Sequence, residues 1–330
     1  MNSFGHIFRI SMYGESHGKS LGVLIDGCPS GIALNEKDFA EDLERRKGGK
    51  KGTTSRREPD RPHILSGVFR NRTTGSPILI FFENTDTKPR AYEAMKDAPR
   101  PGHADFVARV KYGGFHDYRG GGHLSGRVTL GLVAAGVLAK KIIHPVAVRS
   151  RLAEAAGETD IDGAVSAAIK KKNSIGGVVE CEAENIPLGL GEPFFDSVES
   201  LLSHIIFAIP AVRAIEFGSG FQAARMTGSE HNDVYIDKEG RTRTNHAGGI
   251  NGGITNGNPL FFRVAVKPTP SIPQPQQTID LRTGQKRRLS VSGRHDICIA
   301  LRVPVIVEAA VAIVLADLMA LVQKVPRVVT

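Results

Sequence analysis

The sequence predicts a soluble α+β protein with a single domain over residues 1–330. Its composition, 41% hydrophobic and 23% charged, is that of a globular protein with a large core, and the lack of tryptophan makes that core aliphatic. Apolar stretches at 21–25, 77–82 and 260–266 predict strands, which alternate with helices in no regular βαβ rhythm. No Pro/Ser-rich linker divides the chain, but its length leaves open a split near residues 145–160.

The sequence predicts both ends of the first helix. Asn35 is placed to cap it, and Asp38 stands at the third helical position, where its carboxylate completes a capping box. The basic run Arg45-Arg46-Lys47 complements the negative end of the helix dipole, and Gly48-Gly49 stops the helix.

Three further helices follow from caps and apolar patterns. Ser125 is expected to cap a helix from 126 to about 143, and Asp196 a helix with Val198, Leu201, Leu202 and Ile205 on one face. Pro304 suits the first turn of a final long helix. Because that helix is apolar nearly all round, we expect it at the centre of the fold.

The cysteines and the chain ends point to a cytoplasmic protein. Three widely spaced cysteines make neither a disulfide framework nor a metal-ligand set, so no metal site is predicted. The first residues lack the pattern of a signal peptide. The apolar run 303–322 approaches membrane-spanning length but carries Glu308 and Asp317, which favours a buried helix.

The net charge of +9 indicates an anionic ligand. Much of it lies in residues 45–61, a stretch with few apolar residues that we interpret as a mobile basic loop; a merely solvated surface is the simpler interpretation. No aromatic residues interleave the basic ones and no nucleic-acid motif is present, which favours a small anion. A basic nucleic-acid-binding protein is the alternative function.

Glycine-flanked clusters of histidine, arginine and aspartate carry the chemistry. Ser16-His17 lies between Gly14 and Gly18, and similar clusters occur at 100–105, 120–127, 245–253 and 294–296. Taken singly, each cluster has a simpler interpretation: a histidine whose hydrogen bonds are satisfied within the fold, a tight turn or a salt bridge. Together they offer arginines for anionic groups and histidines for proton transfer, without a phosphate-binding P-loop or a nucleophile elbow. The composite predicts acid–base chemistry on a polyanionic substrate.

These clusters, in this order, resemble the chorismate synthase family from about Phe4 to about Val322. The family's first motif is met by residues 14–18 and 25–29, its second by 120–127 and 135–136, and its third by 294–296 and 304–309. The segments 57–60, 100–105 and 245–249 are similar to the family as well. The resemblance implies a β-α-β sandwich with a helical layer between antiparallel sheets, assembled as a homotetramer.

The implied activity is the last step of the shikimate pathway. The family converts 5-enolpyruvylshikimate 3-phosphate (EPSP) to chorismate and phosphate by a 1,4-anti elimination that requires reduced FMN without net redox change. No large insertion adds a reductase function, so we expect an external flavin reductase or reductant. Reduction of the flavin by the protein itself with NADPH is left open.

The resemblance also implies residue roles. His17 is expected beside the departing phosphate as a proton donor, His103 near the flavin ring, and Asp296 near flavin N5, where it helps to remove the proton. The residues expected to contact FMN are His123, Leu124, Ser125, Ala211, Gly252, Lys267, Pro268, Thr269, Pro270, Ser271 and Arg294. Those expected to hold the phosphate and carboxylates of the substrate are Ser16, Arg46, Lys51, Arg100 and Arg127, together with Arg294.

Three positions depart from the family pattern. His123 stands where arginine is usual, Pro270 replaces a usual serine, and the loop at Lys50-Lys51 is one residue shorter, which leaves open which lysine replaces the usual arginine. None of these changes touches His17, His103 or Asp296, so we expect activity to be intact.

Overall fold

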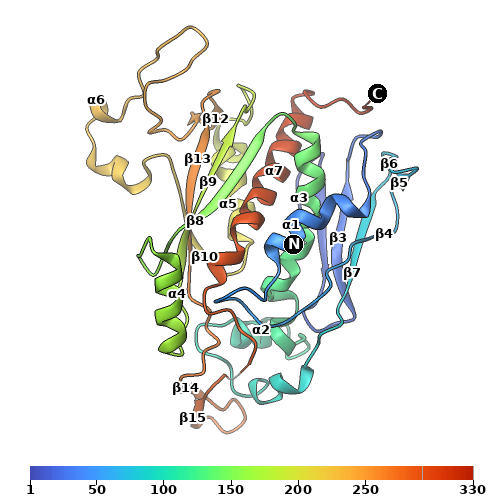
Figure 1. The fold of residues 1–330 in the computed structure, drawn as a ribbon, viewed down its shortest axis with the longest axis vertical. Helices are drawn as coiled ribbons and strands as arrows, with labels where there is room; N and C mark the ends of the chain where they lie inside the picture. Colours follow the sequence, from blue (N-terminus) through green and yellow to red (C-terminus); the bar gives the residue numbers. More distant parts are fainter. Residues whose placement is uncertain (292, 330) are drawn as a thin grey trace.

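A layer of helices lies between two antiparallel sheets in the computed structural model, which describes residues 1–291 and 293–329 (Figure 1). The first sheet has the order β1 (Ser3–Phe4), β2 (Arg9–Gly14), β3 (Ser20–Asp26), β7 (Ile78–Glu83) and β4 (His63–Ile64). The second has the order β10 (Val212–Phe217), β13 (Leu260–Val266), β9 (Gly177–Glu184) and β8 (Ala147–Ala155). The predicted sandwich and its three predicted strands are thereby confirmed.

The central layer is built on α3 (Leu130–Ile142) and α7 (Pro304–Leu321), which Figure 1 shows side by side between the sheets. The helices α1 (Ala40–Arg46) and α5 (Val198–Phe207) pack beside them. Gly136 lets α3 approach α7 closely, because a Cβ there would lie 2.5 Å from the Cα of Ala309. One hydrophobic cluster, which includes Phe8 and Met319, joins both sheets to these helices.

Short elements surround this sandwich. The hairpins pair β5 (Val68–Phe69) with β6 (Arg72–Thr73), β11 (Ile250–Asn251) with β12 (Ile254–Thr255), and β14 (Gln276–Ile279) with β15 (Lys286–Leu289). The outer helices are α2 (Asp105–Lys111), α4 (Ile161–Lys170) and α6 (Gly228–His231). The segment that carries α6 extends away from the sandwich, at the upper left of Figure 1.

The first predicted cap is confirmed. The Asn35 side chain accepts a hydrogen bond from Lys37 N at 2.9 Å, and the Asp38 carboxylate accepts one from Asn35 N at 2.9 Å. The helix begins with a 3₁₀ turn over Glu36–Phe39 that leads into α1. The two reciprocal bonds satisfy N–H groups that have no partner inside the helix.

Ser125 also caps as predicted, whereas the Asp196 cap is wrong by one residue. Ser125 Oγ accepts a hydrogen bond from Arg127 N at 3.3 Å, and a 3₁₀ turn over Gly126–Thr129 precedes α3. At α5 the cap is Ser197, whose Oγ accepts from Ser200 N at 3.1 Å. Ser197 has the extended backbone that an N-cap requires, while Asp196 lies in the preceding 3₁₀ turn.

Two helical stretches are long and apolar enough to cross a membrane, 119–142 and α7, but 78% and 83% of their apolar windows are buried inside the protein. The charges on α7 are paired within the fold. Glu308 accepts hydrogen bonds from Arg45 Nη2 at 2.6 Å and Lys140 Nζ at 2.9 Å, and Asp317 accepts from Ile7 N at 2.7 Å. As predicted, α7 is a buried core helix.

Candidate active site

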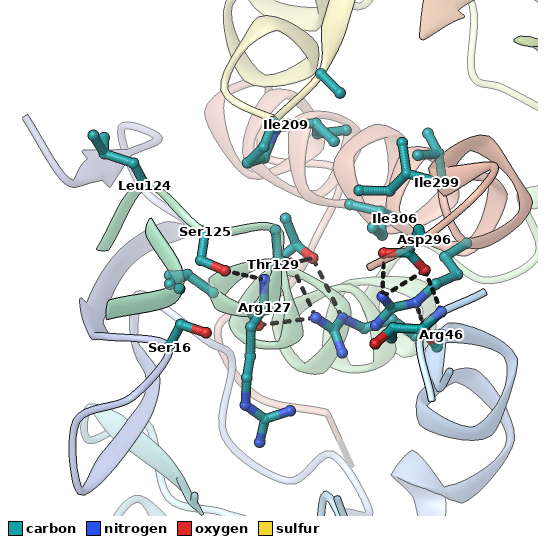
Figure 2. Close-up of a pocket in the computed structure, with 18 of the residues that line it drawn as sticks. Ser16, Arg46, Leu124, Ser125, Arg127, Thr129, Ile209, Asp296, Ile299 and Ile306 are labelled. Carbon is teal, nitrogen blue, oxygen red and sulfur yellow. Dashed lines mark hydrogen bonds and ion pairs between the residues drawn. The ribbon is translucent and has the colours of Figure 1, made fainter. Parts of the chain in front are cut away.

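A cavity of about 1020 Å³ lies at the end of the helical layer where α1, the turn before α3 and the segment before α7 meet. Ten arginine and lysine residues line it against four aspartate and glutamate residues. Figure 2 shows that Ile209, Ile299 and Ile306 form an apolar wall, whereas Arg127 and Ser16 lie on the opposite, polar side. The cavity therefore favours a ligand that is anionic and partly apolar.

A glycine run brings backbone close to the turn that carries Ser16 and His17. Gly120, Gly121 and Gly122 all have positive φ, and a Cβ at Gly122 would collide with the carbonyl oxygen of Asp117. Gly122 O accepts a hydrogen bond from Ser16 N at 3.0 Å. This contact joins two motifs more than 100 residues apart and places both at the cavity.

His17 is buried beside the cavity. Its ring packs edge-on against Tyr92, with ring centroids 4.9 Å apart, and its other side faces Gly120. Burial lowers the pKa of His17 to about 4, helped by the positive charges of Arg56 and Arg119. The imidazole is therefore neutral near pH 7, and its buried Nδ1 has no hydrogen-bond partner among the described residues.

His103 lines the cavity, and its Nδ1 is held by the carboxylate of Asp105. Its Nδ1 lies 2.6 Å from Asp105 Oδ1, and Arg100 forms two charge-assisted bonds to the same carboxylate, at 2.7 and 2.8 Å. Burial opposes the ionised form of Asp105, but the bonds from Arg100 and His103 outweigh it and hold the pKa of Asp105 far below its usual range. Arg100 Nη1 also donates to Ser271 Oγ at 2.9 Å.

Asp296 is buried at the cavity wall and anchored by two groups. Its Oδ1 accepts from Thr54 N at 2.9 Å, and its Oδ2 lies 3.1 Å from Arg302 Nη1. The neighbouring Arg294 lines the cavity and forms an ion pair with Asp86.

Two buried arginines each have a guanidinium nitrogen that makes no hydrogen bond within the described residues. Arg46 Nη2 donates to the carbonyl oxygen of Arg127 at 2.9 Å, and Arg127 Nε donates to Asn84 Oδ1 at 2.6 Å. Arg46 Nη1 and Arg127 Nη2 are buried and make no hydrogen bond within the described part of the chain. Burial lowers the pKa of Arg46 to about 9, helped by the nearby charge of Arg302. The two nitrogens have only long ion-pair contacts, 3.8 Å from Arg46 Nη1 to Asp60 and 3.9 Å from Arg127 Nη2 to Glu58. Since buried donors without a hydrogen bond are costly, they indicate a site for an anionic ligand.

The residues expected to contact FMN fall into two groups. Pro268 and Gly252 do not line the cavity, and Gly252 is exposed in the turn between β11 and β12. Thr269 Oγ1 is buried without a partner among the described residues, which marks this wall as a ligand surface. The expected residues that do line the cavity are His123, Leu124, Ser125, Ala211, Lys267, Thr269, Pro270, Ser271 and Arg294.

The departures from the family pattern are also located. His123 Nδ1 lies 2.7 Å from the carbonyl oxygen of Gly14, so this ring is tied to the backbone. Lys50 lines the cavity, whereas Lys51 points to the carbonyl oxygen of Asp162 at 3.5 Å and does not. Of the two lysines, Lys50 therefore lines the cavity and Lys51 does not.

Several residues at the site were not singled out from the sequence as site residues. The basic loop is partly buried at Thr54, Glu58 and Asp60, and it turns Arg56 into the cavity rather than to solvent. Glu58, Asp60 and Asp105 belong to motifs quoted for the family resemblance, which is the signal that pointed to them. No group of three histidine, cysteine, aspartate or glutamate side chains is arranged to hold a metal ion within residues 1–291 and 293–329.

The fold and cavity define a class of protein: an acid–base enzyme for a polyanionic small molecule, built on helices between antiparallel sheets. The chain belongs to the chorismate synthase family, whose model matches residues 8–320. It is 61% identical over 329 residues to a chorismate synthase of Chitinophaga pinensis, covering 99% of each chain. It is 44% identical to one of Pyrococcus abyssi, covering 95% and 96%. A crystal structure of a chorismate synthase matches 97% of this chain and 93% of its own, with a TM-score of 0.74 and 26% identity.

Proposed function

We propose that the protein is a chorismate synthase, a carbon–oxygen lyase that eliminates phosphate from EPSP to give chorismate. The observation that carries this proposal is a pair of buried guanidinium nitrogens, on Arg46 and Arg127, that make no hydrogen bond within the described residues and belong to a cavity next to Ser16-His17. Their planar donor groups suit the phosphate and carboxylates of EPSP.

Arginines bind and orient the substrate in this proposal. Arg46 and Arg127 hold its anionic groups, with Lys50 and Arg294 at the rim of the same cavity. His17 lies beside the departing phosphate. Burial lowers its pKa most, and the charges of Arg56 and Arg119 lower it further. A bound anion that neutralises these two charges raises the pKa of His17 and allows the ring to supply a proton.

The family depends on a flavin, and we propose that this one is reduced FMN. The residues fit it, because the isoleucine wall suits a flat ring while Thr269 Oγ1 and Arg294 offer polar contacts. When bound there, reduced FMN would supply electron density for the loss of phosphate. His103 faces the same cavity, and Asp296 is held there as a base for the proton lost from the substrate.

Wider properties follow from family membership. We propose a single domain over residues 1–330, a homotetramer, a cytoplasmic location, no partner nucleic acid or membrane, and an external reductase or reductant that supplies the flavin in its reduced form. Arg56 and Lys50 of the basic loop line the cavity, so we attribute the positive charge of this loop to the binding of a small anion.

The test is an anaerobic assay of purified protein with EPSP and dithionite-reduced FMN, in which chorismate and phosphate are both measured. We expect equal amounts of the two products with reduced FMN and none with oxidised FMN. Phosphate release without chorismate, or no product from folded protein, would overturn the proposal.

A further inference from the structure

Arg100, His103 and Asp105 form a compact ionic cluster at the start of α2. Asp105 is 8% exposed and Arg100 is 4% exposed, so both charges are removed from water. Their pairing is bidentate, with Arg100 Nε 2.7 Å from Oδ2 and Nη2 2.8 Å from Oδ1 of Asp105. A buried pair of this kind holds its geometry firmly, because either charge alone would be costly to bury.

The contacts of His103 Nδ1 define which nitrogen carries a proton. Nδ1 lies 2.6 Å from Asp105 Oδ1 and 3.1 Å from Arg100 Nη2. An ionised carboxylate can only accept, so a contact of 2.6 Å to Asp105 Oδ1 requires a proton on Nδ1, and Arg100 Nη2 then donates to Oδ1 at 2.8 Å and not to Nδ1. The shorter contact therefore has Nδ1–H as the donor to Asp105.

The opposite edge of the His103 ring faces the ligand space. A Cβ placed on Gly121 would lie 3.6 Å from His103 Nε2, so this edge points to the glycine run at the cavity. With Nδ1 bonded to Asp105, Nε2 is the nitrogen that is left for a ligand. The other charged or titratable groups around the ring are Lys267, whose Nζ donates to Gly102 O at 2.7 Å, and His295, which interacts electrostatically with His103.

We propose that Asp105, locked in place by Arg100, is a positioning residue that holds His103 with Nδ1–H on its carboxylate and Nε2 toward the reacting ligands. The proposal rests on the proposed function for the role of His103. It changes the expected role of Arg100, whose guanidinium is bonded to Asp105 and Ser271, from binding the substrate to supporting a histidine. This arrangement, a carboxylate that orients an imidazole, is a common way to fix a tautomer.

The first test is made on the unmodified protein without flavin or substrate. Nitrogen-15 NMR of labelled histidines, with His103 assigned from the His103→Asn spectrum, reports which ring nitrogen keeps the proton above the titration midpoint. We expect the Nδ1–H form. The Nε2–H form, which predominates in free histidine, would overturn the proposal, whatever the protein's enzymatic activity.

The second test uses two variants. Asp105→Asn keeps the side-chain shape but removes the carboxylate that accepts from Nδ1–H, and we expect the nitrogen-15 spectrum of the neutral His103 ring to show a larger share of the Nε2–H form. An unchanged share of the Nδ1–H form in this variant would contradict the proposal. Arg100→Lys keeps the positive charge but removes the planar pair of donors that bonds both oxygens of Asp105.

Arg100→Lys separates positioning from substrate binding. We expect kcat to fall by about tenfold while KM for EPSP stays within threefold. A rise in KM of tenfold or more with kcat unchanged would instead show that Arg100 binds the substrate. If the unmodified protein makes no chorismate, the proposed function fails, while the NMR result still decides the state of His103.

Discussion

Arg56 holds Ser16 at two points: its Nη1 donates to Ser16 Oγ at 3.0 Å and its Nη2 donates to Ser16 O at 2.9 Å. This bidentate contact ties the basic loop to the turn that carries His17. It also places a positive charge near the His17 ring, where it contributes to the lowered pKa.

Arg56→Ala is expected to lower kcat by roughly 10- to 100-fold, because it removes two charge-assisted bonds, each of about 1.5–3 kcal/mol. It should also raise the pKa of His17, since a neighbouring cation is lost. Steady-state kinetics and NMR titration of His17 measure the two effects. Arg61→Ala, at an exposed position of the same loop, is the control and should change neither. An unchanged His17 midpoint in Arg56→Ala would contradict this account.

Acid should destabilise the protein through His17. Its folded pKa is about 4, below the usual 6.5, so the unfolded chain binds more protons between these values and stability falls as the pH drops through that window. The loss is on the order of 3 kcal/mol. Urea unfolding of His17→Asn at pH 7 and pH 4.5 should show a smaller pH effect than the unmodified protein. His144→Asn, at an exposed position, should keep the full effect.

Glu58 is a buried carboxylate between arginines, and Glu58→Gln should destabilise the fold by about 3 kcal/mol. It accepts from Thr85 N at 2.8 Å and from Arg56 Nη2 at 2.6 Å. Burial disfavours its charge, but the bonds from Thr85 and the charge of Arg127 outweigh burial and leave its pKa lowered. Denaturant unfolding measures the loss, with the exposed Glu41→Gln as control. Equal stability of the two variants would refute the prediction.

Gly136→Ala should destabilise the protein by about 1–3 kcal/mol, although alanine is the better helix former by about 1 kcal/mol. The added methyl would meet the backbone of Ala309 across the contact between α3 and α7. Gly228→Ala, where nothing lies within 4 Å of the added Cβ, should be neutral or slightly stabilising. Thermal unfolding of both variants measures the sign of the change in stability. A Gly136→Ala variant more stable than the unmodified protein would contradict the prediction, because it would show that α3 and α7 can move apart without cost.

Helix caps, which depend on local sequence, could be predicted well, whereas contacts between distant parts of the chain could not. Asn35 and Ser125 cap as expected because a cap depends on residues within one turn, whereas Asp196 and Ser197 are both good caps and only the backbone angle decides between them. The burial of His17 behind Tyr92 and the bond from Thr54 N to Asp296, 242 residues apart, depend on the tertiary fold. No local pattern contains them.

The most direct test of the account compares phosphate release by the unmodified protein, His17→Ala and His103→Ala at saturating EPSP and reduced FMN. Acid–base groups usually contribute 10²-fold or more, so we predict that each variant loses roughly 10²-fold in kcat while it binds FMN and stays folded. Turnover of both variants within twofold of the unmodified protein would contradict the roles assigned to these two histidines.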